Sequence, residues 1–421
     1  MQSIWPSSPK GKKSIAMILY ANFIATYCIS GIAGMFVIKT LPSIFRDSGM
    51  SAVQIGWFLH IVLLPWCLKI LYTPYIQNYR KTPTKTQTLM VGANLGLIVL
   101  VALSVLLDYG SDFVMFCLLC FLIQVALSIS DITLSATGID THITHYAYIT
   151  AIRVIAAAIG AIFGSGMFLL LYGHYGTQVA TSALVGMIAI FVLPSFFIHK
   201  LAFISSFEPA STSALTSTSV PLKSLKSTLK TALKENYHKI ALILLANLGA
   251  RLGMFMIGVF LVDQKISLET LGLVFGLYST FASITGGVIG ARWGRRLGDK
   301  KTLMVCLFLE CVVFIGFIWA YLGISSHAQG ILIGIFILAV CVLNIKFVAL
   351  YAVMMQYSFG KNSAMDWSIL GGTEAFLAII CPPIGGYLIA FYGFGVFFVC
   401  CLGASFLALL VWGFLGLKGK L

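Results

Sequence analysis

Seven charged side chains lie inside long apolar runs of this sequence. One of them is Asp131, in the stretch SISDITLSATGID at residues 128–140. An ionised side chain in hydrocarbon is costly unless it is paired, hydrated or neutralised, so each is a candidate functional residue. Charges in such places bind oppositely charged ligands, carry protons or close gates by ion pairing. The full set is Lys69, Asp131, Arg153, Arg251, Glu310, Lys346 and Glu374.

The spacing of four of these charges predicts two matched acid–base pairs. Asp131 and Arg153 have their midpoint at position 142, and Lys346 and Glu374 have theirs at position 360. Both midpoints fall in short polar turns, so at about 1.5 Å per residue the members of each pair lie at equal depth. We therefore expect Asp131 to face Arg153 and Glu374 to face Lys346. Three roles remain open for the pairs: a salt bridge that holds a hairpin or gate, a proton carrier, and a substrate contact.

The polar groups within the apolar runs divide into two sets of candidates. The acids Asp131, Glu374 and Glu310 are candidates for proton coupling. The other groups are candidates for the wall of a binding cavity. Four of them are cations, against three acids in the first set, so the cavity region has more cations than anions. This excess suits an anionic ligand such as an iron-chelating carboxylate, although snorkelling or packing against helix ends explains any single cation equally well. The cavity candidates are Asn22, Thr26, Ser30, Lys69, Arg153, Asn247, Arg251 and Lys346.

The composition places these residues in membrane-spanning helices. Hydrophobic residues make up 59% of the 421, charged residues make up 10%, and the mean hydropathy is +0.99. No soluble domain of this size could bury so much apolar surface. Because about 20 apolar residues cross a bilayer, the sequence predicts twelve spans. Their expected limits are 14–40, 52–77, 86–107, 112–138, 148–172, 178–198, 238–262, 268–291, 301–322, 327–357, 364–391 and 394–416.

The positive charges predict the orientation of the spans. The formal net charge is +14, and most of the 27 Lys and Arg residues fall on the side of the membrane that holds both termini. Only Lys39, Arg46 and Lys265 fall on the far side. By the positive-inside rule, both termini are expected in the cytoplasm, and no basic stripe suited to nucleic acid is present. All ten Cys lie in expected spans, where we interpret them as small apolar core residues and not as a metal site.

The chain divides into two related halves. Residues 1–198 and 238–421 each hold six expected spans, and GMSAVQIGWF at 49–58 resembles KISLETLGLV at 265–274. The linker at 199–237 contains a Ser/Thr-rich stretch and then a basic amphipathic helix. This helix, which carries Leu222, Leu225, Leu229 and Leu233, is expected to lie on the cytoplasmic leaflet. Six spans repeated in parallel around a linker are typical of a transporter with its site between two bundles.

This arrangement resembles the major facilitator superfamily. The second half carries a degenerate form of that superfamily's loop signature G-x-x-x-D-R-x-G-R-R, with Ala291 in the place of the acid. The resemblance implies an all-α membrane fold of twelve helices in two pseudo-symmetric six-helix bundles, in which spans one, four, seven and ten line the central cavity. It also implies a gating role for the residues of the loop, which are Gly287, Arg292, Gly294, Arg295 and Arg296.

Two patches carry a narrower resemblance. LPWCLKILYTPYIQNY at 64–79 and SDITLS at 130–135 are similar to stretches of the RhtX/FptX-type importers of rhizobactin and pyochelin siderophores, which stand near the AmpG-like muropeptide permeases. Matched residues are Leu64, Pro65, Trp66, Leu68, Lys69, Pro74, Tyr79, Asp131 and Ile132. Several charges of the family pattern are absent here: Gln77 and Asn78 replace Asp-Arg, and Ser135 replaces an Asp.

The resemblance implies an inner-membrane secondary transporter of a bacterium that imports a ferric siderophore by proton symport through alternating access. A muropeptide-like permease and an exporter of organic anions or drugs are alternatives with the same fold. A membrane receptor or scaffold that transports nothing is an alternative of another class. We expect a monomer that is not an enzyme, with no cofactor, no bound metal of its own and no nucleic-acid partner. Its expected partners are an anionic metal chelate, protons and the lipid bilayer.

Overall fold

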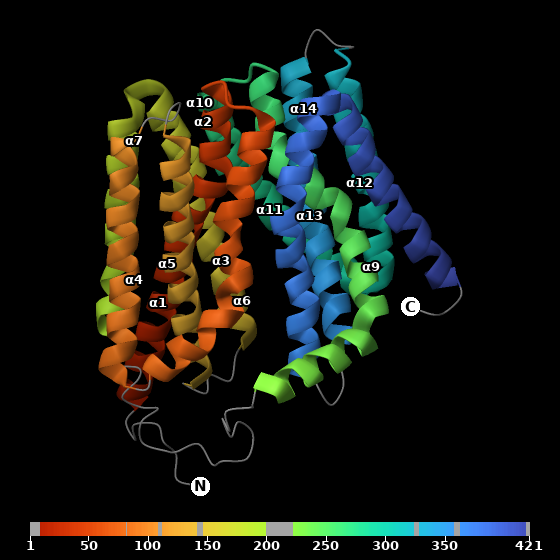
Figure 1. Cartoon of the computed structure of the whole chain (residues 1–421). Coiled ribbons are helices and arrows are strands. Elements are labelled where there is room, and N and C mark those ends of the chain that lie inside the picture. Colours follow the sequence, from red (N-terminus) through yellow and green to blue (C-terminus); the bar gives the residue numbers. More distant parts are fainter. Residues whose placement is uncertain are drawn as a thin grey trace. The chain divides into compact units, whose positions relative to one another are not determined.

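The computed structural model describes residues 9–80, 82–107, 112–140, 146–198, 222–323, 328–357 and 363–417, which are almost entirely helical (Figure 1). In this part of the chain, ten helical stretches are long and apolar enough to cross a membrane. Two of them, Ile155–Phe197 and Glu374–Leu415, have 43 and 42 residues, about twice the length that a bilayer requires. Each is broken by a glycine with non-helical backbone angles, so each contains two spans. The fold is therefore consistent with the twelve expected spans.

The first half of the chain holds the helices of spans one to six. Short π-helical segments at Phe36–Thr40 and Ile162–Met167 interrupt spans one and five. The long helix α7 contains the end of span five and most of span six. The helices are α1 (Pro9–Met35), α2 (Leu41–Asp47), α3 (Ala52–Tyr79), α4 (Pro83–Leu103), α5 (Phe113–Asp140), α6 (Tyr146–Ala161) and α7 (Phe168–Val192).

The second half holds the helices of spans seven to twelve. A π-helical segment at Val274–Tyr278 interrupts span eight, and α14 contains both span eleven and span twelve. In Figure 1, α14 rises, turns at the top and descends again. The helices are α9 (Leu222–Asp263), α10 (Leu268–Leu273), α11 (Ser279–Leu297), α12 (Asp299–Tyr321), α13 (Ala328–Tyr357) and α14 (Ser363–Leu417).

Helix α9 includes the helix that the sequence predicts at the end of the linker. It begins at Leu222 and continues into span seven without a gap. The first part of α9 lies at a steep angle to the rest of the helix (Figure 1). The Ser/Thr-rich stretch before it lies outside the described residues, and the contact of this helix with lipid stays a prediction.

The backbone repeats itself between the two halves. Gly49, after α2, and Lys265, after α9, both have positive φ, and they are 216 positions apart. The same pattern of hydrogen bonds surrounds both residues. The amide of Met50 donates to the carbonyl of Phe45, and that of Ile266 donates to the carbonyl of Leu261. These equal turns confirm that the similar stretches at 49–58 and 265–274 start corresponding spans.

A second pair of equivalent turns separates the last two spans of each half. Gly176 has φ 78° and ψ −177°, and Gly393, which is 217 positions later, has φ 77° and ψ 172°. Residues with a Cβ almost never adopt this backbone conformation. Glycine at these two positions therefore allows each double-length helix to reverse direction.

The contacts group the chain into two compact units, which are described separately. One unit consists of residues 1–44, 61–216 and 268–276, and the other consists of residues 45–60, 217–267 and 277–421. Each unit thus combines most of one half with a short segment of the other. The core of the first unit contains Phe23, Tyr27, Met90 and Leu134, and that of the second contains Leu303, Leu350 and Trp412.

Glycines allow very close helix contacts within the first unit. A Cβ on Gly160 would lie 2.9 Å from the Cα of Gly31 on α1, and a Cβ on Gly166 would lie 2.8 Å from the Cα of Gly276. Both distances are shorter than real Cβ contacts, so a side chain at either position would push the helices apart. Small residues at such positions let helices approach closely in a membrane, where packing drives helix association.

The turn at Gly393 gives a prediction about stability. We expect Gly393→Ala to lower the free energy of unfolding by about 1–3 kcal/mol, because alanine must adopt a backbone conformation that only glycine tolerates. Thermal unfolding of the purified protein in detergent measures this loss. The control is Gly403→Ala in the same helix, where a Cβ meets open space. Equal stability of the two variants would contradict the assignment of Gly393 as the turn.

Candidate functional site

Asp131 on α5 is buried and has three polar partners. Its carboxylate accepts a hydrogen bond of 2.6 Å from the Tyr27 hydroxyl on α1 and one of 3.4 Å from the Arg153 guanidinium on α6. The ammonium of Lys69 on α3 is 3.8 Å from the second carboxylate oxygen. The expected pairing of Asp131 with Arg153 is therefore confirmed. The structure adds a hydroxyl and a second cation.

Both cations around Asp131 lie against aromatic rings. The Arg153 guanidinium is 4.6 Å from the centre of the Tyr27 ring, and the Lys69 ammonium is 5.2 Å from that of the Trp66 ring. The side chains of Lys69 and Arg153 are 37% and 44% exposed, whereas that of Asp131 is 12% exposed. The acid is therefore buried, and its two cations are partly exposed. The ring beneath each cation stabilises the positive charge.

The two patches that resemble the siderophore importers meet through Lys69 and Asp131, and further hydrogen bonds join the same two helices. The indole N–H of Trp66 on α3 donates to Oε1 of Gln124 on α5 at 2.8 Å. One helical turn away, the hydroxyls of Tyr72 and Ser128 form a hydrogen bond. Gln124, Ser128 and Asp131 lie four and three positions apart, so they share one face of α5. Polar contacts therefore join α3 and α5 over about two helical turns.

The second unit contains a different acid site. Glu374 on α14 is buried, and its two oxygens accept hydrogen bonds from the Asn247 amide and the Arg251 guanidinium, both on α9. The guanidinium of Arg251 is also 5.0 Å from the centre of the Phe347 ring. Asn247 and Arg251 are four positions apart and so share one face of α9, and both contact the same carboxylate.

The expected pairing of Glu374 with Lys346 is wrong. Lys346 on α13 is completely buried, and its ammonium donates to Glu310 on α12 and to the Ala246 carbonyl at 3.0 Å. The other oxygen of Glu310 accepts a hydrogen bond of 2.6 Å from the Ser405 hydroxyl. Equal depth in a hairpin was the basis of the prediction, but depth does not determine which face of a helix a side chain occupies. Lys346 and Glu374 lie on faces that meet different neighbours.

The remaining cavity candidates lie on α1. Asn22 and Thr26 are buried and Ser30 is half-buried. The Asn22 amide donates to the Ile18 carbonyl at 2.9 Å, while its own oxygen has no hydrogen-bond partner among the described residues. These three polar side chains therefore lie in the first unit, where they are buried or half-buried. A role for it in a cavity wall stays a prediction.

The loop signature lies at the end of α11. Arg292, Arg295 and Arg296 are exposed there, where cations interact favourably with the carboxyl end of a helix dipole. A Cβ on Gly294 would lie 2.7 Å from the Asp299 carboxylate, which accepts a hydrogen bond of 2.8 Å from Gln356 on α13. Asp299 thus supplies an acid near the signature, in which Ala291 replaces the usual one. A Cβ on Gly287 meets open space, and the gating role of the loop stays a prediction.

Sequence reasoning missed several polar partners. Tyr27, Tyr72, Gln124 and Ser405 are uncharged, so a search for intramembrane charges passes over them. Their helical spacing from charged residues, as in Gln124–Ser128–Asp131, was an available signal. The sequence placed Arg46 on the far side without a partner, and the structure pairs it with Asp263 through contacts of 2.5 and 2.6 Å. Within the described part of the chain, no group of three or more His, Cys, Asp or Glu residues could hold a metal ion.

The fold is that of the major facilitator transporters. The crystal structure of nucleoside transporter NupG matches 94% of this chain and 98% of its own, with 13% identity and a TM-score of 0.70. A bacterial homologue of iron transporter ferroportin in an inward-facing state matches 95% of this chain and 98% of its own, with 14% identity and a TM-score of 0.68. For the D-xylose–proton symporter, the shares are 94% and 96%, the identity is 12% and the TM-score is 0.68.

A sequence comparison agrees with the fold. Residues 240–419 match the family model described as Major Facilitator Superfamily. The chain is thus a multi-pass membrane protein whose fold is shared with solved transporters. Two of these neighbours are named for different solutes, a nucleoside and a sugar with protons, so the fold alone does not define the substrate.

The hydrogen bond between Tyr27 and Asp131 gives a prediction. We expect Tyr27→Phe to lower the free energy of unfolding by about 1–3 kcal/mol, because it removes a donor from a buried carboxylate and keeps the ring beneath Arg153. Thermal unfolding in detergent measures the change. Tyr20→Phe, on the same helix and outside this cluster, is the matched control. A Tyr27→Phe variant as stable as this control would show that the hydroxyl contributes nothing to the site.

Proposed function

We propose that the protein is a secondary active transporter that imports an anionic ferric siderophore by proton symport through alternating access. The observation that carries this proposal is the charge balance around Asp131, where one carboxylate lies near two cations, Lys69 and Arg153. The same proposal places the protein in the inner membrane of a bacterium, as a monomer with both termini in the cytoplasm.

The excess cation supports an anionic substrate. With Asp131 ionised, the cluster of Tyr27, Lys69, Asp131 and Arg153 has a net charge of +1. A cation in a membrane needs a counter-charge, and the exposed sides of Lys69 and Arg153 leave room for a second anion. Arginine binds carboxylates through paired hydrogen bonds, and nearby aromatic rings suit the planar groups of many chelators.

Proton coupling is assigned to Asp131 and Glu374. Each is a buried acid that is paired with an arginine. An anion that binds Lys69 and Arg153 competes with Asp131 for the same positive charges, and a proton on Asp131 removes this competition. This competition links substrate binding to proton uptake. The D-xylose–proton symporter shows that the fold can couple a solute to protons.

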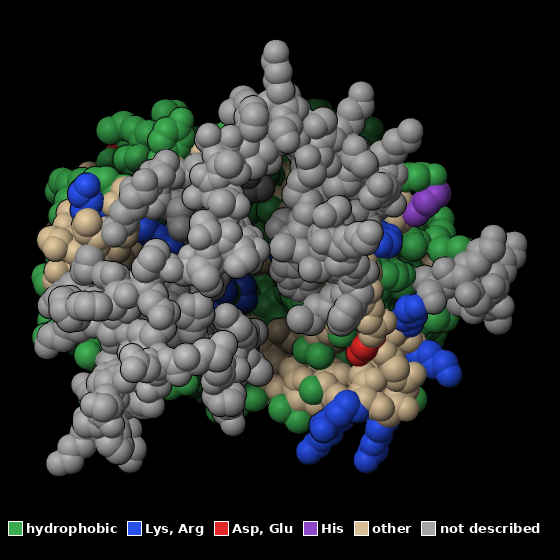
Figure 2. Space-filling model, turned by 90° about the horizontal axis from the view of Figure 1, so that it is seen from below, with side chains coloured by type: hydrophobic (Ala, Val, Ile, Leu, Met, Phe, Trp, Pro, Cys, Tyr) green, Lys and Arg blue, Asp and Glu red, His purple; other side chains and the backbone are tan. Residues whose placement is uncertain are grey.

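The distribution of charge supports the orientation. Figure 2 shows Lys and Arg side chains in blue on the face seen from below, with few acidic side chains among the coloured atoms. Arg295 and Arg296 end α11, next to the α12 segment that starts at Asp299. Basic residues in short loops are typical of the cytoplasmic side of a membrane protein.

An uptake experiment tests the substrate. Cells that lack the protein, and the same cells with the gene restored, are supplied with radiolabelled ferric siderophores and with a labelled muropeptide. We expect the protein to restore uptake of a carboxylate or phenolate siderophore complex, and collapse of the pH gradient to stop it. Uptake of the muropeptide alone would replace the proposal by the permease alternative. Movement of no solute by reconstituted protein under an imposed pH gradient would favour a receptor or scaffold.

The cation pair gives a quantitative prediction. We expect Lys69→Gln and Arg153→Gln each to raise KM for the ferric complex by about tenfold, because each removes a charged partner of the anion. The matched control is Lys239→Gln, whose ammonium donates to the Tyr357 carbonyl at 2.9 Å outside the site. An unchanged KM in both cavity variants would remove the main support for an anionic substrate.

The acid gives a separate prediction about energy coupling. We expect Asp131→Asn to lose proton-driven accumulation but to keep exchange of labelled for unlabelled substrate, because asparagine cannot carry a proton. Reconstituted vesicles measure both activities in one preparation. Full accumulation by this variant would exclude Asp131 as the proton carrier.

A further inference from the structure

The buried pair of Lys346 and Glu310 has a neutral counterpart in the first half of the chain. Turns at the start of corresponding spans, at Gly49 and Lys265, are 216 positions apart. The same shift relates Asn94 on α4 to Glu310 on α12, and Ser130 on α5 to Lys346 on α13. Asn94 and Ser130 are both buried, and the Ser130 hydroxyl donates to the Asn94 side-chain oxygen at 3.0 Å. A polar contact therefore joins the same two spans at the same register in each half.

We propose that Glu310 and Lys346 form a static cross-link that positions α9, and that Glu310 carries no transported proton. In this assignment, the ion pair is the charged form of the interhelical contact that Asn94 and Ser130 make without charge. The neutral pair shows that a contact at this place can serve the fold without any group that titrates.

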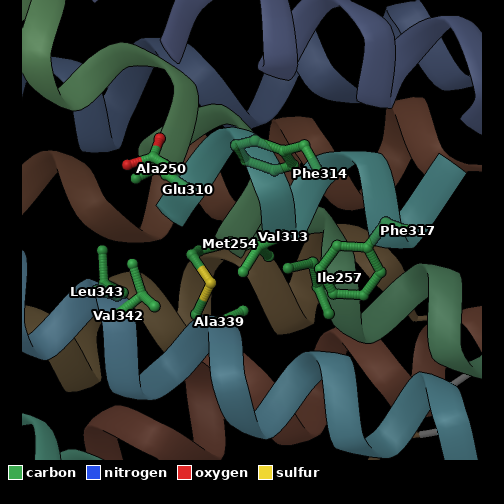
Figure 3. A pocket seen from close by; sticks show the side chains of 10 residues that line it. All are labelled: Ala250, Met254, Ile257, Glu310, Val313, Phe314, Phe317, Ala339, Val342 and Leu343. Atoms are coloured by element: carbon green, nitrogen blue, oxygen red, sulfur yellow. The ribbon is translucent and has the colours of Figure 1, made fainter. Parts of the chain in front are cut away.

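The surroundings of the ion pair fit a static role. Lys346 is completely buried, and Glu310 has a different partner on each oxygen, Lys346 and Ser405. A buried ion pair is tolerated when further hydrogen bonds satisfy its atoms, as they do here. Glu310 also borders a cavity whose other nine lining residues are apolar, among them Met254, Val313 and Phe317 (Figure 3). An apolar cavity holds water poorly, so this cavity is not a water-filled route for protons to the carboxylate.

The cross-link also contacts the helix that carries the second acid site. Lys346 donates to the carbonyl of Ala246, which precedes Asn247, and Asn247 and Arg251 hold Glu374. Within the same turn, Gly249 lies against Glu310, because a Cβ on it would be 3.0 Å from Oε1. The ion pair therefore fixes one side of an α9 turn whose other side holds Glu374. Lys346 and Glu310 are positioning residues for that site.

The cross-link is tested by replacing the polar pair of each half with the pair that the other half carries. We expect Glu310→Asn and Lys346→Ser each to lower Tm in detergent by roughly 10 °C, because each leaves a buried charge without its partner. The double variant E310N/K346S, which copies the pair of the first half, is expected to recover more than half of that loss. The reciprocal single variants Asn94→Glu and Ser130→Lys are also expected to lower Tm. The double variant N94E/S130K is expected to have a higher Tm than either of them. A double variant no more stable than its worse single variant would overturn the proposed equivalence.

Infrared spectroscopy tests the proton assignment without any substrate. Acidification of the wild-type protein in lipid is expected to produce the carbonyl band of newly protonated carboxylic acids. We expect E310N/K346S to keep this band in full, and Glu374→Gln and Asp131→Asn each to remove part of it. Loss of part of the band in E310N/K346S would show that Glu310 takes up a proton and would overturn the proposal. Because neither measurement uses a siderophore, a failure of the proposed substrate leaves both results interpretable.

Discussion

The cost of an unpaired charge in a membrane is the constraint on which this structure depends. The three acids Asp131, Glu310 and Glu374 lie in the interior of their units, and each has a cation and at least one further donor as partners. Because the partners come from other helices, each acid joins its own span to at least one other. Asp131 joins α5 to α1, α3 and α6, while Glu310 joins α12 to α13 and α14. The charged residues thus contribute to helix association, which apolar contacts alone do not specify in lipid.

The two halves share a backbone but differ in their polar chemistry. Equivalent turns at Gly176 and Gly393 have nearly the same φ and ψ. In contrast, the interhelical contact that is neutral in the first half, Asn94–Ser130, is charged in the second, Glu310–Lys346. The duplicated scaffold sets where a polar contact is possible, and each half has its own residues there. Among the described residues, the first half presents an acid together with two partly exposed cations, and the second half has no ion-pair cluster of this kind.

This asymmetry relates the fold to the proposed transport. The neighbours with the same fold carry chemically different solutes, so substrate choice depends on the side chains and not on the helices. The cluster of Lys69, Asp131 and Arg153 has one more positive than negative charge, and the aromatic rings of Trp66 and Tyr27 lie beneath its cations. In the proposed transport, this surface is the part of the protein that meets the anion, and Asp131 is the acid beside it.

The sequence by itself determined the membrane class, the number of expected spans, the repeat and the identity of the intramembrane charges. These features follow from hydropathy and from residue spacing along the chain, and neither depends on how the helices pack. It also placed Asp131 with Arg153, whose hairpin brings them together.

Only the tertiary structure decided the other partners. Lys346 pairs with Glu310, 36 positions away, and Glu374 pairs with Asn247 and Arg251, more than 120 positions away. The rotation of each helix about its axis selects these contacts, and that rotation depends on the packing of all neighbouring helices at once. A single sequence gives the depth of a side chain in the membrane, but the direction in which it points is a property of the packed bundle.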